Sequence, residues 1–301
     1  MSSDGRYAPS PTGPLHVGNL RTALLAWLFA RSAQARFLLR VDDLDPMRSH
    51  REQEERQLAD LKALGIDWDG TPVRQAERFG HHEEALHSLE AQGRVYPCWC
   101  TRADIRAATE APHEGMPEGA YPGSCRNLSE SDRRRREASG RTPALRLDAG
   151  AEVVEFQDRL HGAQEGRVDD FVLRRGDGTP GYQLATVVDD ADMGIGEVVR
   201  GDDLLDSTPR QLLLFRLLGL TAPSFAHVPL VLGRDHTRLA KRHGAVTLAD
   251  RARLGESPAD VLTWMGRSLD LLGEDERAER PGDLLERFDP ERLPREPAVL
   301  R

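Results

Sequence analysis

Apolar residues recur at helical spacing soon after the start of the chain. The residues that define the pattern follow the i, i+3, i+4, i+7, i+8 order of an amphipathic helix: Leu20, Ala23, Leu24, Trp27 and Leu28. Before them, residues 6–19 begin as a short strand and then turn through several Pro and Gly residues. The sequence therefore predicts a strand, a turn of small residues and a helix in direct succession.

Strand and helix patterns then alternate along most of the chain. The predicted strands cover 36–41, 182–188 and 226–232, and the predicted helices cover 51–64, 78–92 and 208–219. This alternation predicts an α/β fold with a doubly wound parallel sheet, whose ligands bind at the C-terminal ends of the strands. Asp42, Asp43 and Asp45 follow the second strand, so we expect them at this edge, although Asp before Pro also initiates turns.

Residues 94–165 differ in character from the segments on either side. Pro, Gly, charged residues and all three Cys occur there, and helical spacing is confined to about 129–139. We expect an insertion at 94–165 between two halves of one sheet domain, at 1–93 and 166–233. The remaining segment, 234–301, contains a loop followed by short helical patterns.

The composition permits a large core, since 39% of the 301 residues are hydrophobic. The apolar stretches fall short of the roughly 20 residues of a membrane span, and the N-terminus has no secretory pattern, so we expect a cytoplasmic protein. The net charge of −9 argues against a nucleic-acid partner, since binding phosphates favours a basic surface, although it is compatible with a local basic face. Local basic groups occur at Arg133–Arg136, by default a solvated helix face, and at Arg234, Arg238, Lys241 and Arg242.

The three Cys residues indicate a metal site. Cys98, Cys100 and Cys125 lie within 28 positions, in an irregular segment with no predicted core of its own. Three thiols buried in a reducing compartment would be an acceptable alternative. The clustering favours structural zinc, which needs a fourth ligand for tetrahedral closure. Tyr121 and His113 are the candidates, and His is the commoner zinc ligand in general.

Residues 6–19 have the composition of an anion site. A helix N-terminus presents free backbone N–H groups and the positive end of the helix dipole. Gly13 and Gly18 would let a ligand lie close to the backbone, and His16 adds a side-chain donor that could contact a phosphate. A tight turn that merely caps a helix is the simpler alternative for each residue taken alone.

Two motifs carry a resemblance to a known family. Residues 6–19 resemble the HIGH signature of class I aminoacyl-tRNA synthetases, and Arg-Tyr-Ala-Pro-Ser-Pro-Thr-Gly at 6–13 resembles the glutamyl branch. The loop Arg238-Leu239-Ala240-Lys241-Arg242 is similar to the second signature, KMSKS, in its KLSKR form. The resemblance covers roughly 6–245 and implies a Rossmann-like catalytic domain, a zinc-stabilised insertion and a short helical C-terminal part.

The resemblance implies an enzyme that activates L-glutamate with ATP and Mg²⁺, in which His16 and Lys241 assist the departure of pyrophosphate. The implied glutamate site comprises Arg6, Ala8, Ser10, Asp42, Tyr182 and Arg200. The implied ATP site comprises Pro9, His16, Gly18, Asn19, Arg238, Leu239, Ala240, Lys241 and Arg242. Two Arg side chains can chelate a side-chain carboxylate, whereas neutral glutamine would leave their charges poorly compensated.

Three residues depart from the family pattern. Asn19 stands where the signature has His, Asp42 stands where Glu is usual, and Ala240 replaces a Ser. The insertion agrees better with the family, because Cys-x-Cys followed by Tyr-x-x-x-Cys is similar to the zinc site of short glutamyl-synthetase paralogues. That likeness implies Tyr121 as the fourth zinc ligand.

Two segments resemble one family of such paralogues: HVGNLRTALLAW and RVDDLDP. Its members transfer activated glutamate to queuosine at the wobble position of the tRNA(Asp) anticodon loop. The segment after residue 245 is also too short for a large anticodon-binding part, which agrees with this expectation. We expect a monomer that binds L-glutamate, ATP and this anticodon loop. A glutamyl-tRNA synthetase acting on the tRNA 3′ end and a non-catalytic nucleotide- or RNA-binding paralogue are the alternatives.

Overall fold

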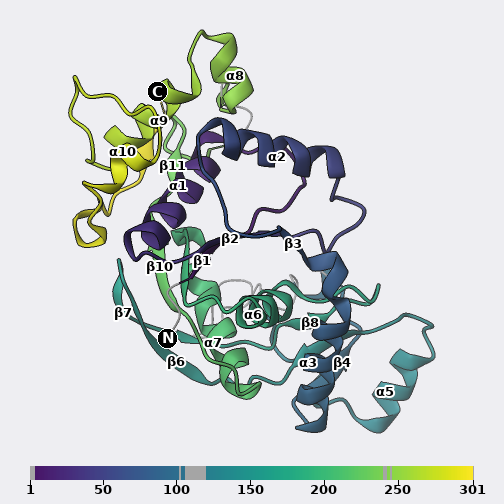
Figure 1. Ribbon diagram of the computed structural model, residues 1–301. Helices are drawn as coiled ribbons and strands as arrows, with labels where there is room; N and C mark the ends of the chain where they lie inside the picture. Colours follow the sequence, from purple (N-terminus) through teal and green to yellow (C-terminus); the bar gives the residue numbers. More distant parts are fainter. Residues whose placement is uncertain (1–3, 102, 106–119, 240–242, 245, 301) are drawn as a thin grey trace.

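A seven-stranded sheet forms the centre of the computed structural model, which describes residues 4–101, 103–105, 120–239, 243–244 and 246–300 (Figure 1). Its strands, in spatial order, are β3 (Val73–Arg74), β2 (Phe37–Val41), β1 (Gly5–Tyr7), β9 (Glu197–Gly201), β10 (Ser224–Val228), β6 (Val153–Asp158) and β7 (Gly162–Arg167). All neighbouring strands pair in parallel except β6 and β7. The predicted doubly wound, mostly parallel α/β fold is therefore confirmed.

Helix α1 (Val17–Ser32) follows β1 directly, as the apolar spacing predicts. Twelve of its 16 residues are buried, so it is a central helix rather than an amphipathic surface helix. It packs on β1 and β9, and α10 (Gly282–Leu285) packs on it as well. The largest hydrophobic cluster is built around this helix, and it fixes the turn before α1 against the sheet.

The structure also contains the other two helices predicted in the first third of the chain. They are α2 (Arg51–Ala63) and α3 (Phe79–Ala91), and the 3₁₀ helix η1 (Gln75–Arg78) leads into α3. Strand β2 ends at Val41, and Asp42 comes directly after it. The predicted position of this aspartate at the C-terminal edge of the sheet is confirmed.

The strand predicted over 182–188 is wrong. Residues Tyr182–Asp192 form helix α6, which begins after Gly181 and contacts α3 and α7 (Thr208–Leu217). Thr186, Val187 and Val188 are β-branched and favour strands in isolation. Their packing between two helices outweighs this preference of about 1 kcal/mol or less, because seven consecutive residues from Leu184 to Asp190 become buried.

The strand predicted over 226–232 is interrupted. Strand β10 ends at Val228, and β11 (Val231–Leu232) leaves the main sheet to pair with β12 (Ala298–Val299). Pro229 lies at the break, where a residue without an N–H cannot donate to a ladder. The helical C-terminal part predicted from the sequence is present as α8 (Leu248–Arg253), α9 (Pro258–Arg267) and α10 (Gly282–Leu285), together with η4 (Pro290–Arg292).

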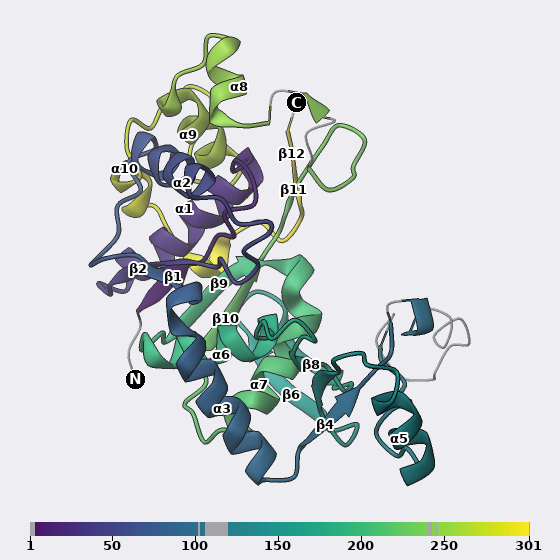
Figure 2. The ribbon, with the colours of Figure 1, turned by 90° about the vertical axis from the view of Figure 1, so that its right-hand side faces the viewer.

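The segment predicted as an insertion is divided between two sheets. Strands β4 (Val95–Cys98), β5 (Ala144–Leu147) and β8 (Val172–Arg174) form a small antiparallel sheet. Together with α5 (Glu130–Glu137), this sheet lies at the end of the molecule remote from α8 (Figure 2). In contrast, β6 and β7 extend the main sheet although β6 and most of β7 fall within 94–165. The domain boundaries given above therefore remain a prediction.

Among the described residues, none of the helices is long and apolar enough to pass through a lipid bilayer.

Candidate active site

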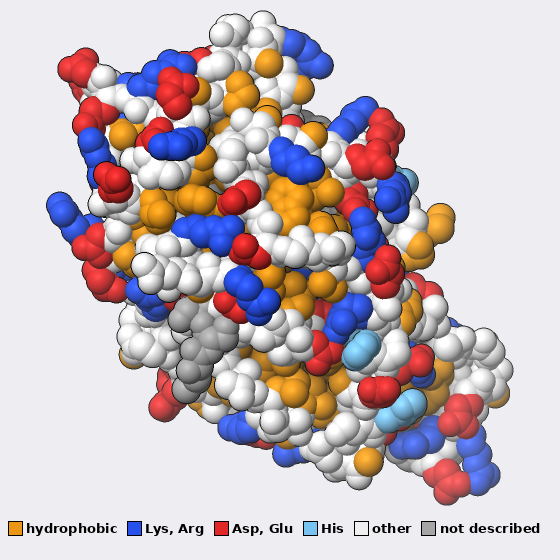
Figure 3. Space-filling view, in the orientation of Figure 1, with side chains coloured by type: hydrophobic (Ala, Val, Ile, Leu, Met, Phe, Trp, Pro, Cys, Tyr) orange, Lys and Arg blue, Asp and Glu red, His pale blue; other side chains and the backbone are white. Residues whose placement is uncertain are grey.

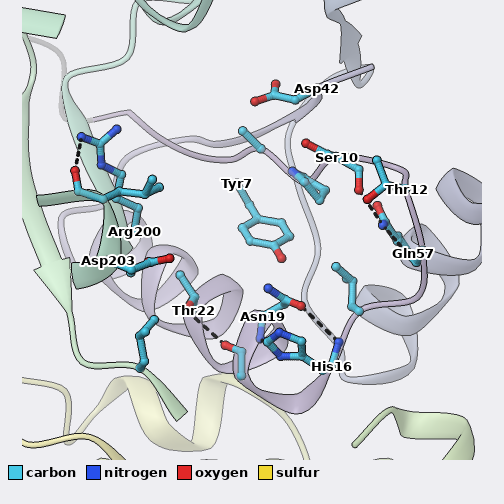
Figure 4. Close-up of a pocket in the computed structure, with 18 of the residues that line it drawn as sticks. Tyr7, Ser10, Thr12, His16, Asn19, Thr22, Asp42, Gln57, Arg200 and Asp203 are labelled. Atoms are coloured by element: carbon cyan, nitrogen blue, oxygen red, sulfur yellow. Dashed lines mark hydrogen bonds between the residues drawn. The ribbon is translucent and has the colours of Figure 1, made fainter. Parts of the chain in front are cut away.

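A cleft of about 400 Å³ opens at the C-terminal ends of β1, β2 and β9. Of the residues assigned to glutamate, it is lined by Arg6, Ala8, Ser10, Asp42, Tyr182 and Arg200. Of those assigned to ATP, it is lined by Pro9, His16, Gly18, Asn19 and Arg238. Residues of the 6–19 segment thus share one cleft with Asp42, Tyr182, Arg200 and Arg238, which are distant in the sequence. In Figure 4, the Tyr7 ring is seen between Arg200, Asp42 and the pair of His16 and Asn19.

The loop predicted to resemble KMSKS is only partly described. Arg238 lies at the rim of the cleft and forms an ion pair with Asp203. Leu239 is buried in the main hydrophobic cluster, so the structure does not place its side chain in the cleft. Ala240, Lys241 and Arg242 lie outside the described residues. The roles of all these residues toward ATP remain predictions.

His16 is the N-cap of α1 and forms a capping box with Asn19. The Asn19 backbone N–H donates to His16 Nδ1 at 3.1 Å, and the His16 N–H donates to Asn19 Oδ1 at 3.2 Å. Burial and the nearby Arg238 lower the pKa of His16, so the ring is neutral at pH 7. Because Nδ1 accepts a hydrogen bond, the ring proton lies on Nε2. His16 therefore offers an N–H donor beside the helix N-terminus, and Asn19 fixes it there.

Gly18 leaves room for the His16 ring. A Cβ at this position would lie 3.0 Å from His16 Nδ1 and 3.2 Å from Val231 Cβ. A Cβ at Gly13 would have nothing within 4 Å. Of the two glycines singled out in the sequence, only Gly18 has neighbours that an added Cβ would displace.

Arg200 is buried on β9, and its hydrogen-bond partners among the described residues are all neutral. Its Nε donates to His227 Nε2 at 3.0 Å, its Nη1 to Gln211 Oε1 at 2.8 Å, and its Nη2 to Thr208 Oγ1 at 2.8 Å. A longer contact of 3.4 Å joins Nη2 to the carbonyl of Leu204. Burial lowers the pKa of Arg200 to about 10, which leaves it positively charged at pH 7. A cation with neutral partners is suited to bind an anionic group.

Arg6, in contrast, already has a carboxylate partner. Its Nε lies 3.1 Å from Asp190 Oδ1, and Arg40 Nη1 lies 2.5 Å from the same oxygen. Arg40 Nε in turn lies 2.7 Å from Asp42 Oδ1. Two guanidinium groups and two carboxyl groups thus alternate in a buried chain.

This alternating chain sets the charge state of both acids. Burial alone would raise the pKa of Asp190, but Arg6 and Arg40 outweigh it and the pKa is lowered. Asp42 has its pKa raised, because burial outweighs the attraction of Arg40. Arg6 is thus paired with a carboxylate within the protein, whereas the described partners of Arg200 are neutral; the roles of both residues toward glutamate remain predictions.

Several buried polar residues of the site are not identifiable from motifs. Arg40 and Asp190 complete the charged chain, and His227 and Gln211 hold Arg200. A charged residue inside an apolar strand, such as Arg40 between Leu39 and Val41, is the one sequence signal that points to a buried ion pair. Tyr182 lies at the mouth of the cleft, where 42% of it is exposed.

The three Cys residues converge as the sequence predicts. Their sulfur atoms all lie within 4.8 Å of one another, and Cys100 Sγ is 3.5 Å from Cys125 Sγ. Zn–S bonds of about 2.3 Å in a tetrahedron place two sulfurs about 3.8 Å apart, so this spacing fits a zinc ion. Tyr121 Oη lies 3.3 Å from Cys98 Sγ and 3.7 Å from Cys100 Sγ. Three thiols and one hydroxyl thus lie together, and His113 lies outside the described residues, so the choice of the fourth ligand remains a prediction.

The basic run at 133–136 lies on α5, where no residue is buried. Arg134 pairs with Glu130 and Arg135 with Asp132 on the same helix. This pairing is typical of a solvated helix face. On the face of the molecule in Figure 3, acidic and basic side chains lie intermixed.

Comparisons with known proteins agree with this fold and site. Residues 4–269 match the model of "tRNA synthetases class I (E and Q), catalytic domain". A "Glutamyl-Q tRNA(Asp) synthetase" of Nocardia farcinica (strain IFM 10152) is 58% identical over 98% of this chain and 92% of its own length. Another from Symbiobacterium thermophilum is 50% identical, over 98% and 95% of the two chains. The chain belongs to this family of class I tRNA synthetases.

The relatives named "Glutamate--tRNA ligase" are longer than this chain. A "Glutamate--tRNA ligase" of Heliobacterium modesticaldum is 40% identical over 98% of this chain but only 62% of its own length. The crystal structure of a glutamate tRNA ligase from Elizabethkingia meningosepticum, in complex with its amino acid, superposes with a TM-score of 0.84 at 26% identity. It covers 99% of this chain and 67% of its own. The family resemblance seen in the sequence is confirmed.

Proposed function

We propose that the protein activates L-glutamate with ATP and transfers the glutamyl group to queuosine at the wobble position of tRNA(Asp). The observation that carries the proposal is the single cleft in which Arg200, a cation with neutral partners, lies near the N-terminus of α1. The glutamyl-Q relatives, which this chain matches over nearly its whole length, support the choice of acceptor.

In the proposed first step, the α-carboxylate of glutamate attacks the α-phosphorus of ATP and pyrophosphate departs with the electron pair of the broken P–O bond. Arg200 binds the side-chain carboxylate, and Asp42 faces the α-ammonium group. His16 donates from Nε2 to a phosphate oxygen, and the backbone N–H groups at the start of α1 stabilise the same charge. Lys241 approaches the departing pyrophosphate from its loop. Mg²⁺ bound to the phosphates supplies further charge stabilisation.

In the proposed second step, a hydroxyl of queuosine attacks the carbonyl carbon of the mixed anhydride. An ester forms, the bond between the carbonyl carbon and the bridging oxygen breaks, AMP leaves with that electron pair, and the hydroxyl proton is released to solvent. No nucleophile of the protein is required. We propose that a zinc ion held by Cys98, Cys100, Cys125 and Tyr121 stabilises the structure and takes no part in either step.

Exchange of labelled pyrophosphate into ATP tests the first step. It is expected with L-glutamate, to be weak with L-glutamine, and to be abolished in Lys241→Ala. Lys62→Ala, which alters the other lysine of the chain, serves as the matched control. Exchange that does not depend on glutamate would contradict the proposal and favour a non-catalytic binding protein. A synthetase for the tRNA 3′ end would pass this test, so the acceptor requires its own experiment.

A further inference from the structure

Three neighbouring strands carry a row of buried polar side chains toward the cleft. Asp158 ends β6, His227 lies on β10 and Arg200 lies on β9. The Cα atoms of His227 and Arg200 are register partners in the parallel pair of β9 and β10. The sheet therefore places these three side chains one after another.

The hydrogen bonds along this row fix the state of the imidazole. His227 Nδ1 lies 2.6 Å from Asp158 Oδ2, and His227 Nε2 accepts from Arg200 Nε at 3.0 Å. A nitrogen that accepts from a guanidinium holds no proton, so the ring proton lies on Nδ1 and is donated to Asp158. Burial lowers the pKa of His227, in agreement with a neutral ring. Asp158 also accepts from the backbone N–H groups of Leu160 and His161.

Two residues of α7 bind the two terminal nitrogens of the guanidinium. Thr208 Oγ1 accepts from Arg200 Nη2 and lies 3.2 Å from His227 Nε2, to which its hydroxyl can donate. Gln211 Oε1 accepts from Nη1. His227, Thr208 and Gln211 are all buried, and all are neutral. They accept from three of the five N–H donors of Arg200 without neutralising its charge.

We infer that Asp158, His227, Thr208 and Gln211 are positioning residues that orient Arg200 and keep its charge available for a carboxylate ligand. The inference rests on the proposed function, because the ligand is taken to be the side-chain carboxylate of glutamate. Discrimination against neutral glutamine then depends on the neutrality of the three residues that contact Arg200, namely His227, Thr208 and Gln211 (the frame), as much as on Arg200 itself. A carboxylate in place of any of these three residues would neutralise the guanidinium from within the protein.

Gln211→Glu tests the inference with nearly no change of shape. The new carboxylate lies against Nη1, and we expect the Kd for L-glutamate, measured by calorimetry, to rise at least about tenfold. The Kd for ATP is expected to stay within about twofold. His227→Phe, which removes the acceptor for Nε, should also weaken glutamate binding and leave ATP binding unchanged. A purely structural role would weaken both ligands together.

The outcomes separate this inference from the proposed function. Wild-type Kd for glutamate in Gln211→Glu, or an equal loss of ATP affinity, would overturn the inference. If His227→Phe does not fold, Gln211→Glu alone decides. If the wild-type protein binds glutamate but exchanges no pyrophosphate, the proposed function is overturned. The binding data then still decide whether His227, Thr208 and Gln211 position Arg200. A wild-type protein that binds no glutamate would overturn both.

Discussion

The guanidinium of Arg6 is held by the carboxylate of Asp190, with Nε and Oδ1 3.1 Å apart and both side chains buried. Arg40 binds the same carboxylate, so one acid on α6 connects β1 with β2. The neighbouring Asp189 points to the other side, where Gln75, Arg78 and His82 bind it. The two adjacent aspartates thus tie α6 to both the sheet and α3.

Asp190→Asn is expected to destabilise the fold strongly. Removal of one partner from a buried ion pair leaves uncompensated charge and typically costs about 3–5 kcal/mol of unfolding free energy. Chemical denaturation measures this loss. Asp192→Asn provides the control on the same region of the chain, because Asp192 is 40% exposed and pairs with Arg78 at the surface. It should cost about 1 kcal/mol or less, and an equal loss in both variants would contradict this account of Asp190.

Gly18→Ala is expected to impair ATP use without unfolding the protein. The added Cβ would press on the His16 ring and on Val231, which shifts the donor of His16 away from its position. We expect the KM for ATP in pyrophosphate exchange to rise about tenfold or more, since a displaced donor loses a charge-assisted hydrogen bond. Gly80→Ala on α3, where a Cβ meets nothing within 4 Å, should leave exchange unchanged. An unaltered KM in Gly18→Ala would contradict the assigned role of His16.

The cysteine cluster is expected to bind one zinc ion per chain, as measured by metal analysis of the purified protein. Tyr121→Phe keeps the ring, over which the Arg146 guanidinium lies at 3.8 Å, but removes the hydroxyl among the sulfurs. We expect this variant to release zinc to a chelator faster than the wild type. His113→Ala tests the other candidate ligand. Rapid zinc loss in His113→Ala, with wild-type retention in Tyr121→Phe, would show that the choice of Tyr121 is wrong.

The pH dependence of stability combines groups of opposite effect, and the lowered pKa values of His16 and His227 disfavour the folded state as pH falls below 6.5. The pKa values of Asp158, Asp189 and Asp190 are lowered, because hydrogen bonds and neighbouring charges outweigh burial. Their stabilisation is complete above the unfolded value of about 3.8 and is lost as pH falls below it. Burial raises the pKa of Asp60 to about 6, so this residue favours the folded state as pH falls from 6 toward 4. Denaturation midpoints at pH 7, 5, 4 and 3 measure the profile; a loss complete by pH 5 would contradict it.

The parts of the site that follow one another in the chain were predictable. Residues 6–19 form the predicted strand, turn and helix, because capping, glycine and apolar spacing act locally. The ion pair of Arg6 was not predictable, since its partner Asp190 is 184 positions away. The same holds for His227, whose contact with Asp158 depends on the pairing of β10 with β6.

The wrong strand prediction over 182–188 has a related physical cause. Residues 182–188 contain a β-branched run that favours a strand locally, whereas the apolar surfaces of α3 and α7 favour a helix. The buried aspartates at its end gain partners only in the helical form, where Asp189 and Asp190 project toward different elements. The tertiary packing that decides between the two forms is absent from a local pattern.

The acceptor is the central claim, and an isolated anticodon stem-loop tests it most directly. A tRNA(Asp) stem-loop that carries queuosine has no 3′ acceptor end, and the same stem-loop with guanosine at the wobble position is the control. With ATP and labelled L-glutamate, we expect label on the queuosine stem-loop alone. Label on the 3′ end of full-length tRNA, with none on either stem-loop, would contradict the account.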